Sequence, residues 1–261
     1  MTDHDFPIVV ADSISRAWLQ TTLLVNAANE QKVFHTVTAV ADAVGEDAEI
    51  RQACDELLVA RGLPSVETVA NTIFPAAMAG TTGEVAELTD RYRKLYPQLR
   101  QFPGNGKGTY FGRLVAYPGP QGEVDQLLLL VQKLRQELST SGPMGARYEV
   151  AVVEPADQGG VDECGLSLGV HAAHRDNGRR AFPCLSMCSF NLDHNQLHLL
   201  AHYRYEYLIT KGYGNYLGLA RLLRYVAEEV GLQAGQMTIV SGRTHVDAPK
   251  GVVDQRLARL A

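Results

Sequence analysis

The sequence predicts a single α/β or α+β domain over residues 1–261. Strand-like and helix-like segments alternate from the beginning, as in VFHTVTAVADAV followed by AEIRQACDELLVARG. The segment VDQLLLLVQKLRQEL has the apolar spacing of an amphipathic helix. The chain has 261 residues, 46% of them hydrophobic, which is enough for a sizeable core. No linker rich in Pro, Gly and Ser divides it, so one domain is expected.

The expected helices begin or end at recognisable residues. Ser13 is suited to cap the first helix, and Pro75 limits the third. Gly62 and Gly231 are suited to end the second and the last helix. In chain order, helices are expected at 13–34, 48–62, 65–79, 80–99, 124–138 and 216–232.

The expected strands are apolar runs bounded by turn residues. Pro155 ends one of them, and the turn at 193–195 joins two others into a hairpin. Residues 102–110, rich in glycine, are expected to form a loop. In chain order, strands are expected at 33–44, 147–155, 183–193, 196–208 and 237–247.

Charge, cysteine content and the lack of long apolar runs argue against several classes of protein. The net charge of -5 gives no reason to expect nucleic acid as a partner, and a small ligand fits better. The four cysteines are too sparse for a disulfide scaffold. His171 and His174 form an HxxH motif, but no second ordered ligand pair accompanies it, so no metal is expected. No signal peptide or membrane-spanning run is present, so a cytoplasmic protein without a membrane partner is expected.

Six short motifs follow one another in a specific order. They are GTYFGRLVAYPG, VDQLLLLVQKLRQE, ARYEVAVVEP, AFPCLSMCSF, HYRYEYLITKGYGNYLGLARL and VSGRTHVD. In this order and spacing the chain resembles the thymidylate synthase family, from about residue 65 to 255 and most clearly from 105 onwards. The resemblance implies one thymidylate synthase-like domain, in which helices cover a mixed sheet and a homodimer forms through that sheet.

The resemblance places Cys184, in the Pro-Cys dipeptide, at the position of the family's nucleophile. A thiolate there adds to C6 of a pyrimidine ring, which makes C5 nucleophilic toward a one-carbon electrophile. Nearby arginines would lower the pKa of the thiol, and Arg179, Arg180 and Arg204 are the candidates. The alternative is that Cys184 is a small buried hydrophobe in a strand.

By the same resemblance Arg204 binds the nucleotide phosphate, a group that suits a guanidinium. Arg147 matches the second arginine of a pair that reaches into the partner subunit, so a homodimer is implied. The alternative for Arg204 is an ion pair with Glu206 or another acid. Sequence alternation along 196–208 would place Arg204 and Glu206 on one face of a strand.

Three further residues match substrate contacts of the family. Asn215 lies eleven residues after Arg204 and would read the pyrimidine edge with its donor and its acceptor, which favours uracil. Its alternative is a helix N-cap. His245 resembles the histidine that contacts the sugar hydroxyl. Tyr110 matches the Gly-x-Tyr-Gly region loosely.

The chain also departs from the family pattern. Asn71 stands where the family has its catalytic glutamate, and an amide cannot exchange protons as a carboxyl does. Glu67 is one turn away and could replace it only in a shifted register. Tyr205 and Tyr207 replace a serine and the aspartate that holds the folate pterin. The family's C-terminal extension, which closes over the cofactor, is lacking.

The leading hypothesis is therefore a one-carbon transferase that adds a methyl or hydroxymethyl group to C5 of a pyrimidine nucleotide through Cys184. The resemblance implies 5,10-methylenetetrahydrofolate as the cofactor. A second hypothesis is an enzyme of nucleoside or natural-product metabolism that uses the same scaffold without folate. A third is a nucleotide-binding dimer without catalysis.

Overall fold

The computed structural model describes residues 7–102, 104–106, 108–119, 122–139, 167–170 and 183–261. The expected strand at 147–155, the HxxH motif, and Arg147, Arg179 and Arg180 lie outside the described residues.

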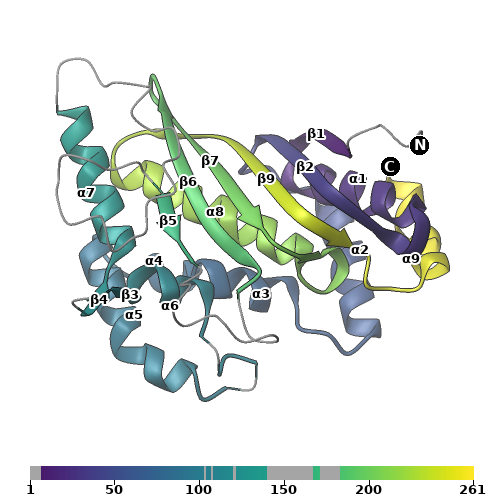
Figure 1. Ribbon diagram of the computed structural model, residues 1–261, viewed down its shortest axis with the longest axis horizontal. Helices are drawn as coiled ribbons and strands as arrows, with labels where there is room; N and C mark the ends of the chain where they lie inside the picture. The colour runs from purple at the N-terminus through teal and green to yellow at the C-terminus, as the bar shows by residue number, and fades with distance from the viewer. Residues whose placement is uncertain (1–6, 103, 107, 120–121, 140–166, 171–182) are drawn as a thin grey trace.

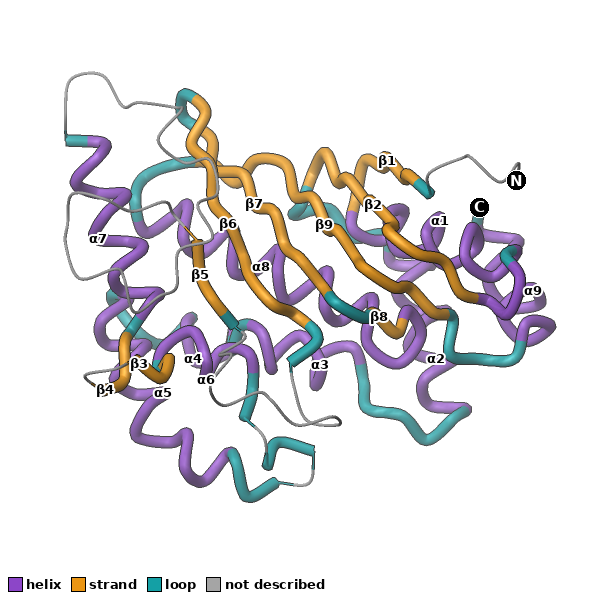
Figure 2. Tube along the Cα trace, in the orientation of Figure 1, coloured by secondary structure: helices purple, strands orange, loops and turns teal. Residues whose placement is uncertain are grey.

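Seven described strands form one mixed sheet, in the order β1-β2-β9-β7-β6-β5, with β8 also paired to β9 (Figure 2). The β1–β2, β7–β9 and β8–β9 pairs are parallel, and the others are antiparallel. The strands are β1 (Ile8–Ser13), β2 (Lys32–Asp42), β5 (Ser167–Gly169), β6 (Leu185–Asp193), β7 (Gln196–Tyr203), β8 (Glu206–Tyr207) and β9 (Gln233–His245). The hairpin β3 (Tyr117–Gly119) and β4 (Gly122–Val124) stands apart. The expected α/β (α+β) class with a mixed sheet and helices is confirmed.

Nine described α-helices accompany the sheet. They are α1 (Ile14–Ala27), α2 (Ala48–Ala60), α3 (Val66–Ile73), α4 (Ala76–Ala79), α5 (Val85–Leu99), α6 (Tyr110–Val115), α7 (Gln126–Leu138), α8 (Tyr213–Glu229) and α9 (Lys250–Leu257). Ser13 caps α1 as expected, by accepting a hydrogen bond from the Arg16 N–H. This helix ends seven residues earlier than 34, because Ala28 is extended and Glu30 and Gln31 adopt positive φ before β2.

The expected strand at 196–208 is broken in two. Strand β7 ends at Tyr203, the chain bends at Arg204 and Tyr205, and β8 begins at Glu206. Tyr203 and Glu206 are both fully buried, and Tyr207 is exposed. In a regular strand, residues three apart such as Tyr203 and Glu206 would lie on opposite faces. The bend therefore reverses the alternation of faces, and the expected common face for Arg204 and Glu206 is wrong.

One face of the sheet is buried under helices. Five residues that pair with one another across neighbouring strands are all buried, namely Val9, Thr38, Ile239, Ala201 and Cys188. Helix α8 passes behind these strands, and no described helix lies in front of them (Figure 1). The core lies between the sheet and helices such as α1 and α8.

Helices α3 and α8 pack closely because α8 has glycines at the contact. A Cβ added at Gly218 would lie 2.8 Å from the Ala70 carbonyl oxygen and 2.8 Å from the Ile73 Cβ. A Cβ at Gly214 would lie 2.5 Å from the Val69 Cβ. These distances are shorter than van der Waals contact, so only glycine lets the helices approach this far.

Gly218→Ala is expected to lower the free energy of unfolding by roughly 1–3 kcal/mol, because the added methyl meets backbone that cannot move cheaply. Urea denaturation measures this effect. The matched control is Gly251→Ala in α9, where nothing lies within 4 Å of the new Cβ. The control should be neutral or stabilising by up to about 1 kcal/mol. Equal stability of the two variants would contradict the close packing.

Candidate functional site

A cavity of about 420 Å³ opens where α3, α6, α8 and the ends of β6 and β8 converge. Its lining comes from segments far apart in the sequence. The lining residues are Pro64, Thr68, Val69, Thr72, Gly104, Asn105, Gly108, Thr109, Tyr110, Arg113, Pro183, Cys184, Tyr205, Tyr207, Lys211 and Asn215. A space of this size holds a small organic molecule.

Three of the sequence-predicted site residues meet at this cavity, namely Tyr110, Cys184 and Asn215. Arg204 and His245 are not part of its lining, although each contacts a group near it. Asn71 is also absent from the lining and is exposed to solvent on α3. The structure therefore brings together the expected nucleophile and the expected base-reading amide.

Cys184 lies directly before β6, and a backbone hydrogen bond fixes its position. Its carbonyl accepts a hydrogen bond of 2.8 Å from the Arg204 N–H. The side chain is half-buried and faces the cavity, so it is not the fully buried core cysteine of the alternative interpretation. Tyr110 approaches from α6, and its hydroxyl lies close to the backbone of Cys184 and Leu185.

The pKa of the Cys184 thiol is raised, first by burial and then by the charge of Glu206. Arg204 and Lys211 act in the opposite direction, but they do not outweigh these two effects. The expectation that arginines lower this pKa overall is therefore not met among the described residues. Arg204 acts in the expected sense, and the buried acid next to it opposes it.

Asn215 is a helix residue and does not cap the helix. Helix α8 begins at Tyr213, and the π-helical turn Leu208–Gly212 leads directly into it. The N-cap interpretation of Asn215 is therefore wrong. Its side chain is 3% exposed and reaches the cavity wall. An amide placed there is available for hydrogen bonds to a molecule in the cavity.

The π-helical turn is held by Asp247. The Asp247 carboxylate accepts hydrogen bonds from the backbone N–H groups of Ile209 (2.9 Å) and Thr210 (3.3 Å), and from the Thr210 hydroxyl. Asp247 therefore stabilises the structure of this turn. By fixing this turn it positions Lys211, which lines the cavity and whose pKa burial lowers.

Sequence reasoning missed Lys211 and Arg113 as residues of the site. Both line the cavity, and no carboxylate does so among the described residues. Lys211 stands four residues before Asn215, which is one helical turn, and this spacing could have indicated it. Two cations without an acid in the wall favour an anionic ligand.

Tyr205 and Tyr207 form an aromatic surface at the cavity. Their ring centroids are 4.7 Å apart, and the Tyr205 hydroxyl lies 3.2 Å from Nδ1 of His245. Burial lowers the pKa of His245. A flat ring could stack on these tyrosines. The Arg243 guanidinium lies 5.8 Å from the centre of the Tyr205 ring, within the range of a cation–π contact.

Helix α3 offers hydroxyl groups to the cavity and no acid. Thr68 and Thr72 are one turn apart and both line it. Glu67 points elsewhere, because its carboxylate accepts two 2.7 Å hydrogen bonds from Arg221 and one of 3.3 Å from Arg51. These arginines hold the pKa of Glu67 below its usual range. Neither Asn71 nor Glu67 therefore supplies a carboxyl group to the cavity.

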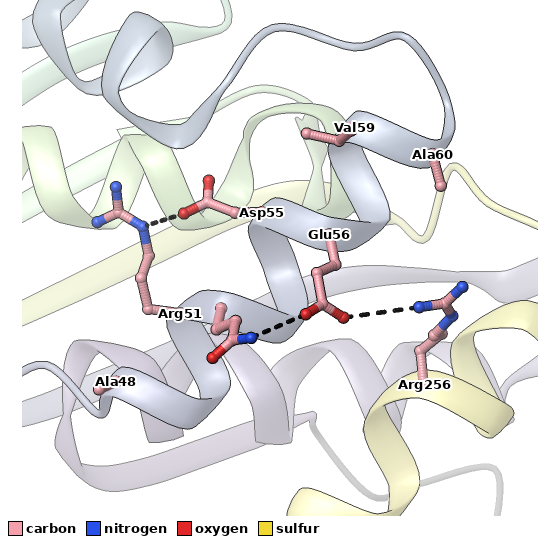
Figure 3. A pocket seen from close by; sticks show the side chains of 8 residues that line it. Ala48, Arg51, Asp55, Glu56, Val59, Ala60 and Arg256 are labelled. Carbon is pink, nitrogen blue, oxygen red and sulfur yellow. Dashed lines mark hydrogen bonds and ion pairs between the residues drawn. The ribbon is translucent and has the colours of Figure 1, made fainter.

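A larger hollow of about 680 Å³ lies on α2 beside α9 and contains none of the predicted site residues (Figure 3). Its charged side chains form ion pairs with one another, Arg51 with Asp55 at 2.9 Å and Arg256 with Glu56 at 3.7 Å. We therefore assign the candidate site to the smaller cavity. In the described segments, no group of three His, Cys, Asp or Glu side chains could hold a metal ion. No helix in them is long and apolar enough to span a membrane.

Comparison with known proteins finds one informative relative. No family model matches the chain. A curated protein of Methanosarcina mazei, described as "Putative thymidylate synthase", is 28% identical over 125 residues. The match covers 48% of this chain and 47% of that protein, so the chain spans about half the length of its relative. The similarity supports a distant relationship to thymidylate synthases.

Asp247→Ala is expected to loosen the turn at 208–212, since three hydrogen bonds to it are lost. The amides of Ile209 and Thr210 should lose protection in hydrogen exchange, with a loss of stability of roughly 1–3 kcal/mol. Asp247→Asn, which keeps one acceptor oxygen, is the control and should retain most of the protection. Unchanged exchange in the alanine variant would show that the turn does not depend on Asp247.

Proposed function

We propose that the cavity binds a pyrimidine nucleotide and that Cys184 attacks C6 of its ring, so that C5 accepts a one-carbon group. The observation that carries this proposal is the meeting of Cys184, Tyr110 and Asn215 at one cavity with two cations in its wall. The distant similarity to a thymidylate synthase supports the same class of reaction.

Asn215 is proposed to read the base. Its carboxamide has one donor side and one acceptor side, which match the N3–H and a carbonyl of uracil. The side chain is 3% exposed, so hydrogen bonds formed there face little competition from water. We therefore propose a uracil nucleotide in preference to a cytosine nucleotide.

Cationic residues are proposed to hold the phosphate. Lys211 and Arg113 line the cavity, and Arg113 is also held by a 3.2 Å hydrogen bond to the Val170 carbonyl. Arg204 and Arg147 remain proposed phosphate ligands on the basis of the family resemblance, and His245 remains a proposed sugar contact. A guanidinium that is fixed by other contacts loses little entropy when it binds phosphate.

The proposed chemistry begins when the Cys184 thiol loses its proton. The sulfur then forms a bond to C6, and the C5–C6 π electrons move toward C5 and the C4 carbonyl. C5 forms its new bond to a one-carbon electrophile and then loses its hydrogen as a proton. The thiolate leaves C6 last, which restores the ring double bond and frees Cys184.

The described wall of the cavity does not fit a folate in the manner of the family. Tyr207 replaces the aspartate that holds the pterin, and the described lining contains no carboxylate. The Tyr205–Tyr207 pair offers a stacking surface only. This pair favours the second candidate function, an enzyme on the same scaffold that activates the pyrimidine through Cys184 without methylenetetrahydrofolate.

Release of tritium from C5-tritiated dUMP, UMP, dCMP and CMP tests the covalent step, with and without methylenetetrahydrofolate. We expect release from a uracil nucleotide and none from the Cys184→Ala variant, because the attacking sulfur is gone. A dependence on folate would select one-carbon transfer, and release without folate would select the second candidate. Cys188→Ala is the matched control, since this cysteine lies in β6, four residues after Cys184, and is buried on the face of the sheet that the helices cover.

Nucleotide binding is measured on the same proteins by thermal shift. Cys184→Ala should keep the stabilisation by nucleotide, which shows that it is folded. Full tritium release by this variant would rule out the covalent mechanism.

We also propose a homodimer through the face of the sheet that no described helix covers. Two rows of residues that pair across neighbouring strands lie on this face, Ile8–Val37–Val240–His202–Met187 and Val10–Ala39–Thr238–Leu200–Ser189. Ile8 is 58% and Val10 is 71% exposed, the residues on β2, β9 and β7 are partly exposed, and Ser189 at the end of the second row is buried. Exposed apolar side chains in a contiguous group are typical of a protein interface.

Light scattering after size exclusion should give about twice the chain mass of 28.5 kDa. Leu200→Glu should give the monomer mass with an unchanged circular dichroism spectrum, because two carboxylates would face each other across the interface. Val59→Glu, at a 78% exposed position of α2, should stay a dimer. A monomeric wild-type protein would contradict the proposal.

A further inference from the structure

A buried acid lies beside Cys184, and the proposed reaction has not yet used it. Glu206 is 1% exposed in β8. Its Oε2 accepts a 2.6 Å hydrogen bond from the Ser241 hydroxyl, while its Oε1 has no hydrogen-bond partner among the described residues. A carboxyl group buried without a cation or a second donor is costly to keep charged. Such a group needs a physical explanation beyond packing.

The backbone brings Glu206 to the nucleophile. The hydrogen bond from the Arg204 N–H to the Cys184 carbonyl fixes the start of β6 against the bend, and Glu206 follows two residues later. Strand β8 is in turn paired to β9, with Glu206 opposite Thr244. The charge of Glu206 therefore acts on the Cys184 thiol.

The surroundings of both groups are polar but contain few charges. Ser241 of β9 hydrogen-bonds to Glu206, and the charge of Glu206 acts on Tyr203 of β7, Tyr216 of α8 and Cys184 before β6. Cys184 is faced by Tyr110 of α6, by Arg204 and by Lys211. The Tyr203 hydroxyl is fully buried and, like Glu206 Oε1, has no hydrogen-bond partner in the described part of the chain. Burial raises the pKa of Tyr203 well above its usual value, so this phenol stays neutral.

We propose that Glu206 and Cys184 share one negative charge, which rests on the Glu206 carboxylate in the free protein and on the Cys184 sulfur at the moment of attack. The S–H bond breaks as a proton leaves Cys184, and an O–H bond forms as Glu206 takes up a proton. The pair therefore keeps a charge of -1 throughout. This inference rests on the proposed nucleophilic role of Cys184.

The titration of Glu206 fits this exchange. Burial raises the pKa of Glu206 to about 7, against the weaker opposing effect of the Ser241 hydrogen bond. A carboxyl group of this kind can take up and release a proton near neutral pH. Glu206 acts through Cys184 and is therefore a positioning residue. Neither Asn71 nor Glu67 brings a carboxyl group to the cavity, and Glu206 supplies one near the nucleophile instead.

The pH profile of Cys184 alkylation by iodoacetamide tests the shared charge without any nucleotide. The Cys184 peptide is quantified by mass spectrometry, so the other cysteines do not interfere. In Glu206→Gln no negative charge lies near the thiol to oppose its ionisation, so the pH profile of alkylation should move roughly one pH unit lower. Below the midpoint this corresponds to an alkylation rate about tenfold faster. Glutamine can still accept the Ser241 hydrogen bond, so the fold should persist.

Two further variants complete the test. Asp193→Asn makes the same change of net charge at the exposed turn between β6 and β7, and its profile should equal that of the wild type. Ser241→Ala removes the hydrogen bond that favours the Glu206 carboxylate, so its profile should move the same way as that of Glu206→Gln, but less.

An unshifted profile in folded Glu206→Gln would overturn the proposal, and so would equal shifts in Glu206→Gln and Asp193→Asn. If Glu206→Gln does not fold, an unshifted Ser241→Ala profile overturns it. Because the measurement uses no nucleotide, loss of the proposed pyrimidine chemistry would leave these outcomes readable.

Discussion

The bend at Arg204 and Tyr205 is the constraint on which the site depends. There the chain leaves β7 and resumes pairing with β9 at β8 in the same register, and Glu206 is buried although it lies an odd number of residues after the buried Tyr203. Gly242 makes this possible, because a Cβ there would lie 3.0 Å from the Arg204 carbonyl oxygen. That oxygen accepts a 3.2 Å hydrogen bond from the Arg243 N–H. Local reversal of this kind is a common use of irregular strands beside functional sites.

The two sides of the bend have opposite electrostatic characters. On the cavity side the described wall contains Arg113 and Lys211 and no acid. On the core side Glu206 lies among neutral hydroxyl groups. Cys184 sits between them, with Arg204 and Lys211 favouring the thiolate and Glu206 opposing it. An anion in the cavity would lie near the cations and away from the buried acid, which suits a nucleotide phosphate.

Much of the fold could be predicted because its signals are local. The Ser13 cap, the amphipathic α7 and the β6–β7 turn each depend on neighbouring residues. The short β1 and α6, and helix α9, lacked a pattern long enough to predict. The break before β8 was missed because Gly242, a residue of another strand, permits it. Cys184, Tyr110 and Asn215 were identified through an ordered set of motifs, whereas Lys211, Arg113 and Glu206 required the tertiary structure.

The position of the acid is the main chemical difference from the family pattern. An acid on α3 could contact the substrate directly, but Asn71 is exposed there and Glu67 is bound to arginines. Glu206 instead lies below the nucleophile, outside the cavity lining. Under the proposed mechanism, a carboxyl group outside the lining affects the ionisation of the Cys184 sulfur without contacting a pyrimidine in the cavity. In the proposed reaction, the groups of the described cavity wall that can exchange protons with the ring include Lys211 and the hydroxyl groups of Thr68, Thr72 and Tyr110.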